Sequence, residues 1–243
     1  MTAEMTRLDA QNKTDSAAPD ADKSAAAPRQ TAPLRLYLVR HGETAWSLTG
    51  QHTGLADIPL TAKGENEARA LAGLLRDIPF THTLVSPRQR AWRTQELALP
   101  DAAAAVEPGL AEWDYGDYEG LRTAEILRQQ PDWNLFRDGC PRGESPAQVA
   151  NRADRLIARL RVLSGNVALF SHGHFGGVLA ARWIGLPLSA AEHLPLGTAS
   201  LSILGYALRH ADISVISLWN AAPRDLSGAP NEPQKPADAA DEQ

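Results

Sequence analysis

Three short apolar segments of this sequence are each followed directly by basic residues. The segment 36–39 leads into Arg40-His41-Gly42, the segment 83–85 leads into 86–90 (SPRQR), and the segment 167–170 leads into 171–174 (SHGH). Parallel strands of one sheet end at the same edge, and ligands of such sheets bind at that edge. The sequence therefore predicts a site at which two histidines and at least two arginines converge.

Histidine and arginine in this combination suit the transfer of a phosphoryl group. Such a group carries negative charge on its equatorial oxygens, so catalysis consists mainly of positioning and charge stabilisation. The planar guanidinium of an arginine binds two of those oxygens at once. Gly42 is expected to let the backbone approach the phosphate, and a helix that begins near Gly173 is expected to add N–H groups.

The elements that position these residues alternate between apolar runs and helical patterns, which is typical of an α/β sheet flanked by helices. We expect a three-layer α/β/α fold with a mostly parallel central sheet. Strands are predicted at about 34–39, 83–85, 167–170, 198–206 and 213–219. Helices are predicted at about 61–76, 87–97, 145–163 and 173–183, with a short one after residue 121. Ser145-Pro146 marks the start of the long helix, because a serine cap followed by proline is favoured there.

Composition narrows the class of protein. The chain has 243 residues, of which 43% are hydrophobic and 22% are charged, so it can build an ordinary core. A net charge of −5 argues against non-specific binding to nucleic acid, which needs a basic face. A single cysteine, Cys140, forms no intramolecular disulfide and fits a reducing cytoplasm; we expect it to be a buried or inert thiol. No run of 18 apolar residues occurs, so no membrane span is expected.

The two ends of the chain differ from its middle. Residues 1–33 and 221–243 are rich in Ala, Asp and Pro and have few apolar side chains. Such segments cannot bury enough apolar surface to fold, so both are predicted to be disordered extensions. One catalytic domain is expected over residues 34–220.

Five segments, taken in order, resemble the histidine phosphatase superfamily, whose members have the phosphoglycerate-mutase-like fold. The segments are 40–44 (RHGET), 53–61, 86–94, 110–120 and 171–173, and the resemblance spans residues 36–220. It implies that His41 becomes a phosphohistidine, that Glu112 is the general acid and that the second histidine, His172, completes the catalytic set. It further implies a phosphate-binding set made of Arg40, Arg90, Thr53 and Gly54. Candidate substrate contacts are Ser47, Gln51, Tyr115 and Thr198.

The resemblance implies a metal-independent phosphatase that acts on a small phosphorylated metabolite and needs no cofactor. The chain is most similar to the branch that hydrolyses sugar bisphosphates such as sedoheptulose 1,7-bisphosphate, so sugar phosphates and bisphosphates are the expected substrates. It departs from that branch at 175–177 (FGG), where relatives carry an arginine, and this departure puts recognition of a second phosphate in doubt. The oligomeric state is left open.

Several alternatives remain at this stage. Asp114, Asp117 and Glu119 lie in the same acidic loop as Glu112 and compete with it for the role of general acid. His172 and His174 have the spacing of a metal-binding pair, although no third ligand is indicated. If no metal binds, His174 is expected to form part of the wall of the site. The competing functions are those of a mutase, a phosphohistidine-protein phosphatase and a catalytically inactive sugar-phosphate-binding protein. The interval from Glu112 to His172 contains no lysine, and it is shorter than in cofactor-dependent mutases, which favours hydrolysis.

Overall fold

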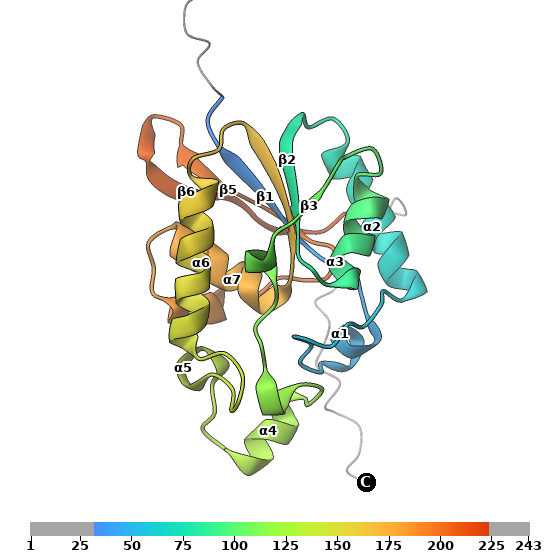
Figure 1. Cartoon of the computed structure of the whole chain (residues 1–243), viewed down its shortest axis with the longest axis vertical. Helices are drawn as coiled ribbons and strands as arrows, with labels where there is room; N and C mark the ends of the chain where they lie inside the picture. The colour runs from blue at the N-terminus through green and yellow to red at the C-terminus, as the bar shows by residue number, and fades with distance from the viewer. Residues whose placement is uncertain (1–31, 224–243) are drawn as a thin grey trace, which may run out of the picture. The chain divides into compact units, whose positions relative to one another are not determined.

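A central sheet organises the computed structural model, which describes residues 32–223 (Figure 1). Within this range the sheet has six strands in the order β3-β2-β4-β1-β5-β6. The strands are β1 Arg35–Arg40, β2 Phe80–Val85, β3 Ala105–Val106, β4 Asn166–Ser171, β5 Leu201–Ala207 and β6 His210–Ala221. The first four run parallel, β5 is antiparallel to β1, and β6 is antiparallel to β5. The prediction of a mostly parallel sheet is confirmed.

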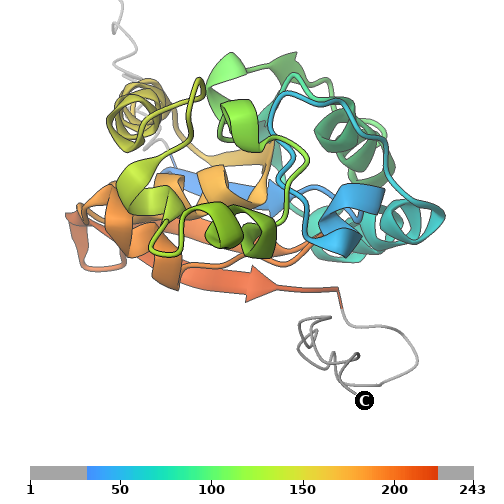
Figure 2. The same cartoon turned by 90° about the horizontal axis from the view of Figure 1, so that it is seen from below.

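Helices cover both faces of this sheet. They are α1 Ala45–Thr49, α2 Ala62–Leu75, α3 Gln89–Ala98, α4 Thr123–Gln129, α5 Leu135–Asp138, α6 Pro146–Leu160 and α7 Gly173–Trp183, with the 3-10 helices η1 Pro108–Leu110, η2 Gly116–Tyr118 and η3 Leu188–His193. In Figure 2, α6 (yellow-green) and the pair α2 and α3 (cyan to green) lie on opposite sides of β1 (blue). The predicted three-layer arrangement is confirmed.

Strand β1 shows why a nearly continuous apolar run is needed at the centre. Leu36 and Leu38 belong to the core cluster that includes α6 and α7, whereas Tyr37 and Val39 belong to the cluster that includes α2 and α3. Successive side chains of a strand point to opposite faces, so a strand covered on both sides has no polar face. Each buried leucine or valine contributes about 1.5–3 kcal/mol relative to exposure.

Helix α6 begins where the sequence predicts. The Ser145 hydroxyl accepts the backbone N–H of Gln148, the Gln148 side chain accepts the backbone N–H of Ser145, and Pro146 occupies the first turn. This reciprocal pair is a capping box, which satisfies N–H groups that a helix start otherwise leaves unbonded. The buried stripe that follows is Val149, Ala153, Leu156, Ile157 and Leu160.

Helix α3 begins two residues later than predicted, at Gln89 rather than Pro87. Arg88 keeps an extended backbone with φ −88° and ψ 136° and provides no side-chain cap. Asp57 from a distant loop accepts the Gln89 N–H instead, at 2.8 Å. A cap supplied from elsewhere in the chain leaves no local sequence signal.

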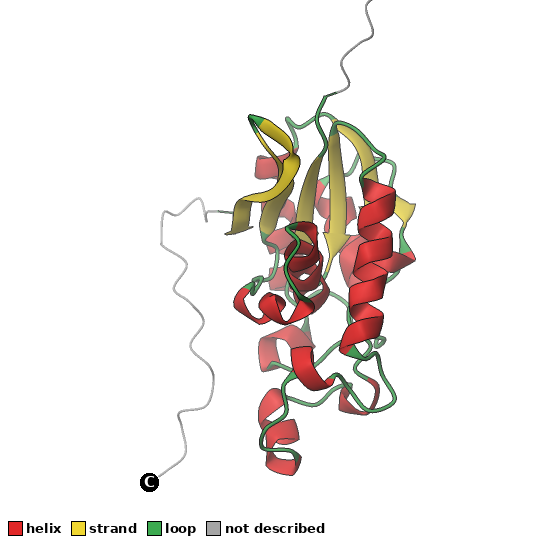
Figure 3. Ribbon diagram, turned by 90° about the vertical axis from the view of Figure 1, so that its left-hand side faces the viewer, coloured by secondary structure: helices red, strands yellow, loops and turns green. Residues whose placement is uncertain are grey.

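A group of short helices and loops lies beyond the end of the sheet at which β1 ends. Figures 1 and 3 both show it, and α4 and α5 belong to it. The sequence predicts only α4 among the elements there. No helix in residues 32–223 is long and apolar enough to cross a membrane. The predicted disordered extensions fall outside this range except at their inner ends.

Candidate active site

The ends of β1, β2 and β4 bring the predicted basic residues together. These strands are neighbours, and Arg40 pairs in register with Ser171 while Val85 pairs with Phe170. The chain then turns so that the rings of His41 and His172 lie with centroids 5.2 Å apart. The predicted convergence of two histidines is thus confirmed, and it follows from the parallel register.

His41 is held as a neutral ring with one free nitrogen. Its Nδ1 lies 2.8 Å from the carbonyl oxygen of Gly42, and because a carbonyl only accepts, Nδ1 carries the proton. Burial, with the positive charges of Arg90 and Arg40, holds the pKa of His41 well below its usual range. The lone pair of Nε2 is therefore available for attack on phosphorus.

Gly42 has a different role from the one expected. A Cβ at this position would lie 2.3 Å from the backbone oxygen of Gly64 in α2, so the glycine allows α2 to pack closely. Its N–H donates to the Thr94 hydroxyl at 3.0 Å rather than to the cavity.

Arg90 and His172 form a buried layer behind His41. The Nε of Arg90 donates to His172 Nδ1 at 3.2 Å, so the other nitrogen, Nε2, carries the proton and donates to the Ser86 hydroxyl at 2.6 Å. The Arg90 guanidinium also donates to the backbone oxygens of Ala56, Thr53 and Gly54. Neither side chain is exposed to solvent. In the described structure the Nε, Nη1 and Nη2 atoms of Arg90, which the resemblance assigns to phosphate binding, each donate to at least one group of the protein.

Arg40 is the arginine that reaches the cavity. The residue is partly buried, its Nη1 donates to the Leu196 carbonyl, and its buried Nε has no hydrogen-bond partner in the described part of the chain. Buried donors are almost always bonded, so one left open beside a cavity favours an anionic ligand. Gly173 allows this position, because a Cβ there would lie 3.3 Å from the guanidinium.

Glu112 also lines the cavity, and its carboxylate is held by three backbone N–H groups. One carboxylate oxygen accepts the N–H groups of Trp113 and Phe175 at 2.9 and 2.8 Å, and the other accepts the His174 N–H at 3.1 Å. Helix α7 has no side-chain cap of its own, so Glu112 caps it from another loop. Two of the N–H groups expected to bind phosphate are therefore used to orient this carboxylate.

One cavity of about 380 Å³ joins these groups. Of the predicted site residues, it is lined by Arg40, His41, Ser47, Gln51, Thr53, Glu112 and Tyr115. Arg90, His172, Gly54 and Thr198 are not in the lining, and the Gly54 N–H donates to Glu119 at 2.8 Å. Of the four aromatic residues that the sequence offers as a pocket wall (Trp46, Trp113, Tyr115 and Trp133), Tyr115 alone lines it.

Further residues line the cavity, and some of them come from short elements that the sequence did not predict or from the loop after η3. They include Phe136 of α5, Glu192 of η3 and residues 194–196. The only local signals for these two elements are the Asn134 side chain, which caps α5, and Pro187 before η3.

Metal ligation finds no support in this arrangement. Among residues 32–223, no three His, Cys, Asp or Glu side chains are grouped so as to hold a metal ion. Both ring nitrogens of His172 are hydrogen-bonded, and His174 Nδ1 is hydrogen-bonded to the Tyr115 hydroxyl at 2.6 Å. Cys140 is buried, as predicted, and burial raises the pKa of its thiol to about 12.

Residues 36–220 match the family described as the histidine phosphatase superfamily, branch 1. The chain belongs to this superfamily. An acid phosphatase of Mycobacterium tuberculosis is 43% identical over 188 residues, which cover 76% of this chain and 92% of that protein. Sedoheptulose 1,7-bisphosphatase of Saccharomyces cerevisiae is 37% identical over 184 residues, covering 63% of this chain and 68% of that protein. A solved structure of a Mycobacterium tuberculosis open reading frame matches with a TM-score of 0.73 and 39% identity, covering 78% of this chain and 98% of that one. The protein is a histidine phosphatase and hence a phosphoric monoester hydrolase.

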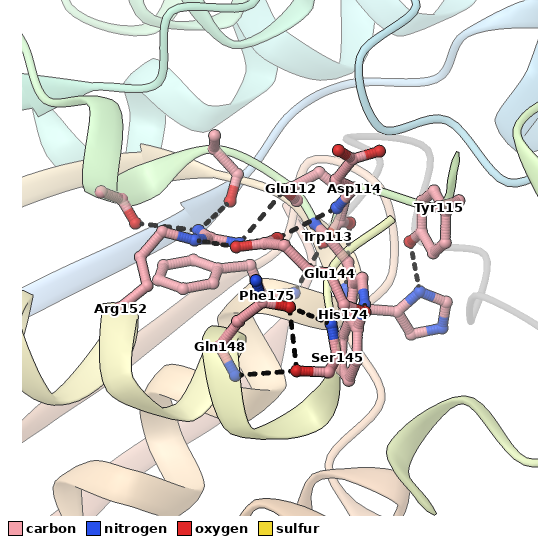
Figure 4. A network of polar contacts seen from close by, with 12 residues as sticks. Glu112, Trp113, Asp114, Tyr115, Glu144, Ser145, Gln148, Arg152, His174 and Phe175 are labelled. Atoms are coloured by element: carbon pink, nitrogen blue, oxygen red, sulfur yellow. Dashed lines mark hydrogen bonds and ion pairs between the residues drawn. The ribbon is translucent and has the colours of Figure 1, made fainter. Parts of the chain in front are cut away.

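In this histidine phosphatase an ion pair supports the loop that carries Glu112 (Figure 4). Arg152 of α6 makes a two-pronged contact with Glu144, at 2.9 and 2.7 Å, and donates to the backbone oxygens of Ala111 and Glu112. Glu144 in turn accepts the N–H of Asp114 at 3.1 Å. The pair therefore fixes the backbone on both sides of the Glu112 carboxylate.

Replacing Arg152 with methionine is expected to lower turnover about tenfold and the free energy of unfolding by about 2 kcal/mol, because hydrogen bonds to charged groups are lost and Glu112 is no longer held. Urea unfolding measured beside kcat tests both effects. Arg159→Met is the matched control, since Arg159 lies on the same helix but pairs with Glu107 while 53% exposed. Its expected loss is below about 1 kcal/mol, without a change in turnover. Equal losses of turnover and of stability in the two variants would contradict the proposed support of the Glu112 loop by Arg152.

Proposed function

We propose that this histidine phosphatase hydrolyses phosphate monoesters of small metabolites, with sugar phosphates as the leading class, through a phosphohistidine on His41 and without a metal ion. The observation that carries the proposal is the content of one cavity. A neutral histidine with a free Nε2, an arginine with a buried and unbonded Nε, and an oriented carboxylate all line it. The similarity to an acid phosphatase and a sugar bisphosphatase supports the same substrate class.

The first chemical step transfers the phosphoryl group to the protein. The lone pair of His41 Nε2 forms a bond to phosphorus while the bond between phosphorus and the ester oxygen breaks. Glu112, protonated beforehand, gives its proton to that oxygen, so an alcohol leaves. Of its two carboxylate oxygens, Oε2 accepts one N–H group and Oε1 accepts two, so Oε2 has the capacity for that proton.

The second step restores the enzyme. Water attacks phosphorus, Glu112 takes a proton from it, and the bond to Nε2 breaks to release inorganic phosphate. Arg40 supplies positive charge to the phosphoryl oxygens in both steps, while Arg90 acts from behind His41 through its charge. The Nδ1–H bond to Gly42 keeps the ring in the tautomer that attacks.

Phosphate release from a panel of sugar phosphates in excess EDTA tests this function. We expect the rate to be unchanged by EDTA, because no step uses a metal ion. A rate that disappears in EDTA and returns with a divalent cation would contradict the mechanism. Consumption of a phosphorylated substrate without phosphate release would instead indicate a mutase.

A further inference from the structure

The cavity has two regions with different charge. We call its shielded part the inner end: His41 and Glu112 are buried there beside the partly buried Arg40, and the proposed reaction places the transferred phosphoryl group among them. We call its more exposed part the outer wall, which includes Gln51, Thr123 and Phe136 together with Glu192. Among the described residues that line the cavity, Arg40 is the only arginine or lysine.

The histidines of the lining do not supply further positive charge. Burial, followed by the effect of His174, lowers the pKa of His52 to about 3. Burial also lowers the pKa of His174. Both rings are therefore neutral at ordinary pH, and the cationic capacity of the cavity is concentrated at its inner end.

Glu192 gives the outer wall a negative charge. Its carboxylate accepts Asn134 Nδ2 at 3.2 Å and lies 3.1 Å from His193 Nε2. No arginine or lysine in the described range forms an ion pair with it. Its side chain is 40% exposed, so the charge persists at the mouth of the cavity.

The remaining wall suits hydroxyl groups. The Tyr115 hydroxyl and His174 Nδ1 share a hydrogen bond of 2.6 Å, and both residues line the cavity, so each adds an uncharged polar group. Thr53 and Thr123 add hydroxyl oxygens, and Gln51 adds an amide. Neutral donors and acceptors of this kind bind alcohols without requiring charge.

Helix α7 leaves no room for a second cation near His174. A Cβ at Gly176 would lie 2.6 Å from Cδ1 of Leu196, and a Cβ at Gly177 would lie 2.9 Å from the Leu194 carbonyl oxygen. A long basic side chain at either position would displace the segment 194–196, which itself lines the cavity.

We propose that the site selects phosphate monoesters whose alcohol is uncharged and carries hydroxyl groups, and that it discriminates against substrates with a second phosphate or a carboxylate. This selectivity rests on the proposed hydrolytic function of the same cavity. It assigns to Glu192 the role of a specificity-determining residue, since a second anionic group would lie against a carboxylate with no cation to neutralise it.

Two matched pairs of substrates test the proposal. Fructose 6-phosphate is compared with fructose 1,6-bisphosphate, and glycerol 3-phosphate is compared with 3-phosphoglycerate. We expect the wild-type kcat/KM to be about tenfold higher for the first member of each pair, the size expected for one like-charge contact near a protein surface. Preference for the bisphosphate would overturn the inference.

Substitution of Glu192 shows whether this residue causes the selectivity. Glu192→Lys is expected to shift the ratio of kcat/KM values about tenfold or more toward the bisphosphate, through KM, with Glu192→Gln intermediate. Glu96→Lys, on the exposed face of α3, is the control and should leave the ratio unchanged. An unchanged ratio in Glu192→Lys would contradict the role of Glu192.

Two further readouts separate this inference from the proposed function. If p-nitrophenyl phosphate is hydrolysed and the hydrolysis depends on His41, the proposed function is supported. If the enzyme then prefers the bisphosphate, the inference about selectivity fails but the proposed function does not. If no ester is hydrolysed, the proposed function fails. Calorimetric titration of His41→Ala with fructose 6-phosphate and with fructose 1,6-bisphosphate then decides the selectivity, and tighter binding of the bisphosphate overturns it.

Discussion

His41→Ala is expected to abolish formation of the phosphoenzyme and to reduce phosphate release by roughly 10⁶, the loss seen when another hydrolase is deprived of its nucleophile. The geometry gives the reason. His41 is the histidine of the cavity whose Nδ1 is fixed as a donor, by the Gly42 carbonyl, and whose Nε2 is free. His172 has both nitrogens bonded, and in His174 the nitrogen bonded to Tyr115 is Nδ1. His41 is also the lining histidine that directly follows Arg40 in the chain.

The measurement is transfer of radiolabelled phosphoryl groups from substrate to protein, quenched in alkali because phosphohistidine is labile to acid. His82→Ala is the matched control, since His82 lies exposed on β2 and should leave both label and turnover intact. Label retained by His41→Ala on a different histidine would show that the nucleophile has been assigned to the wrong residue.

The sequence was most informative where a side chain's role depends on its own strand or helix. The apolar run from Leu36 to Val39 predicts a buried strand, and the position of His41 shortly after it predicts that the ring lies at the end of that strand. Ser145-Pro146 predicts the start of α6 for the same reason, because the cap and the proline of the first turn are adjacent in sequence.

The sequence did not predict contacts with partners distant in the chain. Arg90 donates to His172 and to backbone oxygens of the loop 53–56, and His172 donates to Ser86. Gly42 fits a phosphate loop, but it is needed for the close approach of α2. Bonds of this kind form only when the tertiary structure assembles, and no local pattern records them.

The outer wall of the cavity was the least predictable part for a related reason. Phe136 and Glu192 come from α5 and η3, which are too short to show hydrophobic periodicity. Their positions depend on packing beside α7 and on the bond from Asn134 to Glu192. The residues at the inner end of the cavity were thus predicted from the sequence, whereas Phe136 and Glu192 of the outer wall were not.

Glu112 is favoured as the general acid because the other acidic residues of its loop, Asp114, Asp117 and Glu119, bond to other groups and do not line the cavity. Asp114 accepts the Gly116 N–H at 3.0 Å, Asp117 pairs with Arg142, and Glu119 accepts the N–H groups of Gly54 and Ala56. None of the three lines the cavity, whereas Glu112 does. A carboxylate that must reach the ester oxygen has to face the cavity, so the geometry favours Glu112 over the other acids of its loop.

Glu112→Gln is accordingly expected to lower kcat on a sugar monophosphate by about 10²–10⁴, the usual contribution of a general acid. The amide oxygen can still accept N–H groups of α7, so the fold should persist while the transferable proton is lost. The loss should be much smaller on p-nitrophenyl phosphate, because p-nitrophenolate leaves without a proton. Asp114→Asn provides the matched control and should retain turnover on both esters. Equal losses on the two esters would mean that Glu112 acts by holding α7 rather than by giving a proton. That outcome would transfer the acid role to a group that reaches the cavity only when substrate is bound, since among the described carboxylates of the lining only Glu192 remains, at the outer wall.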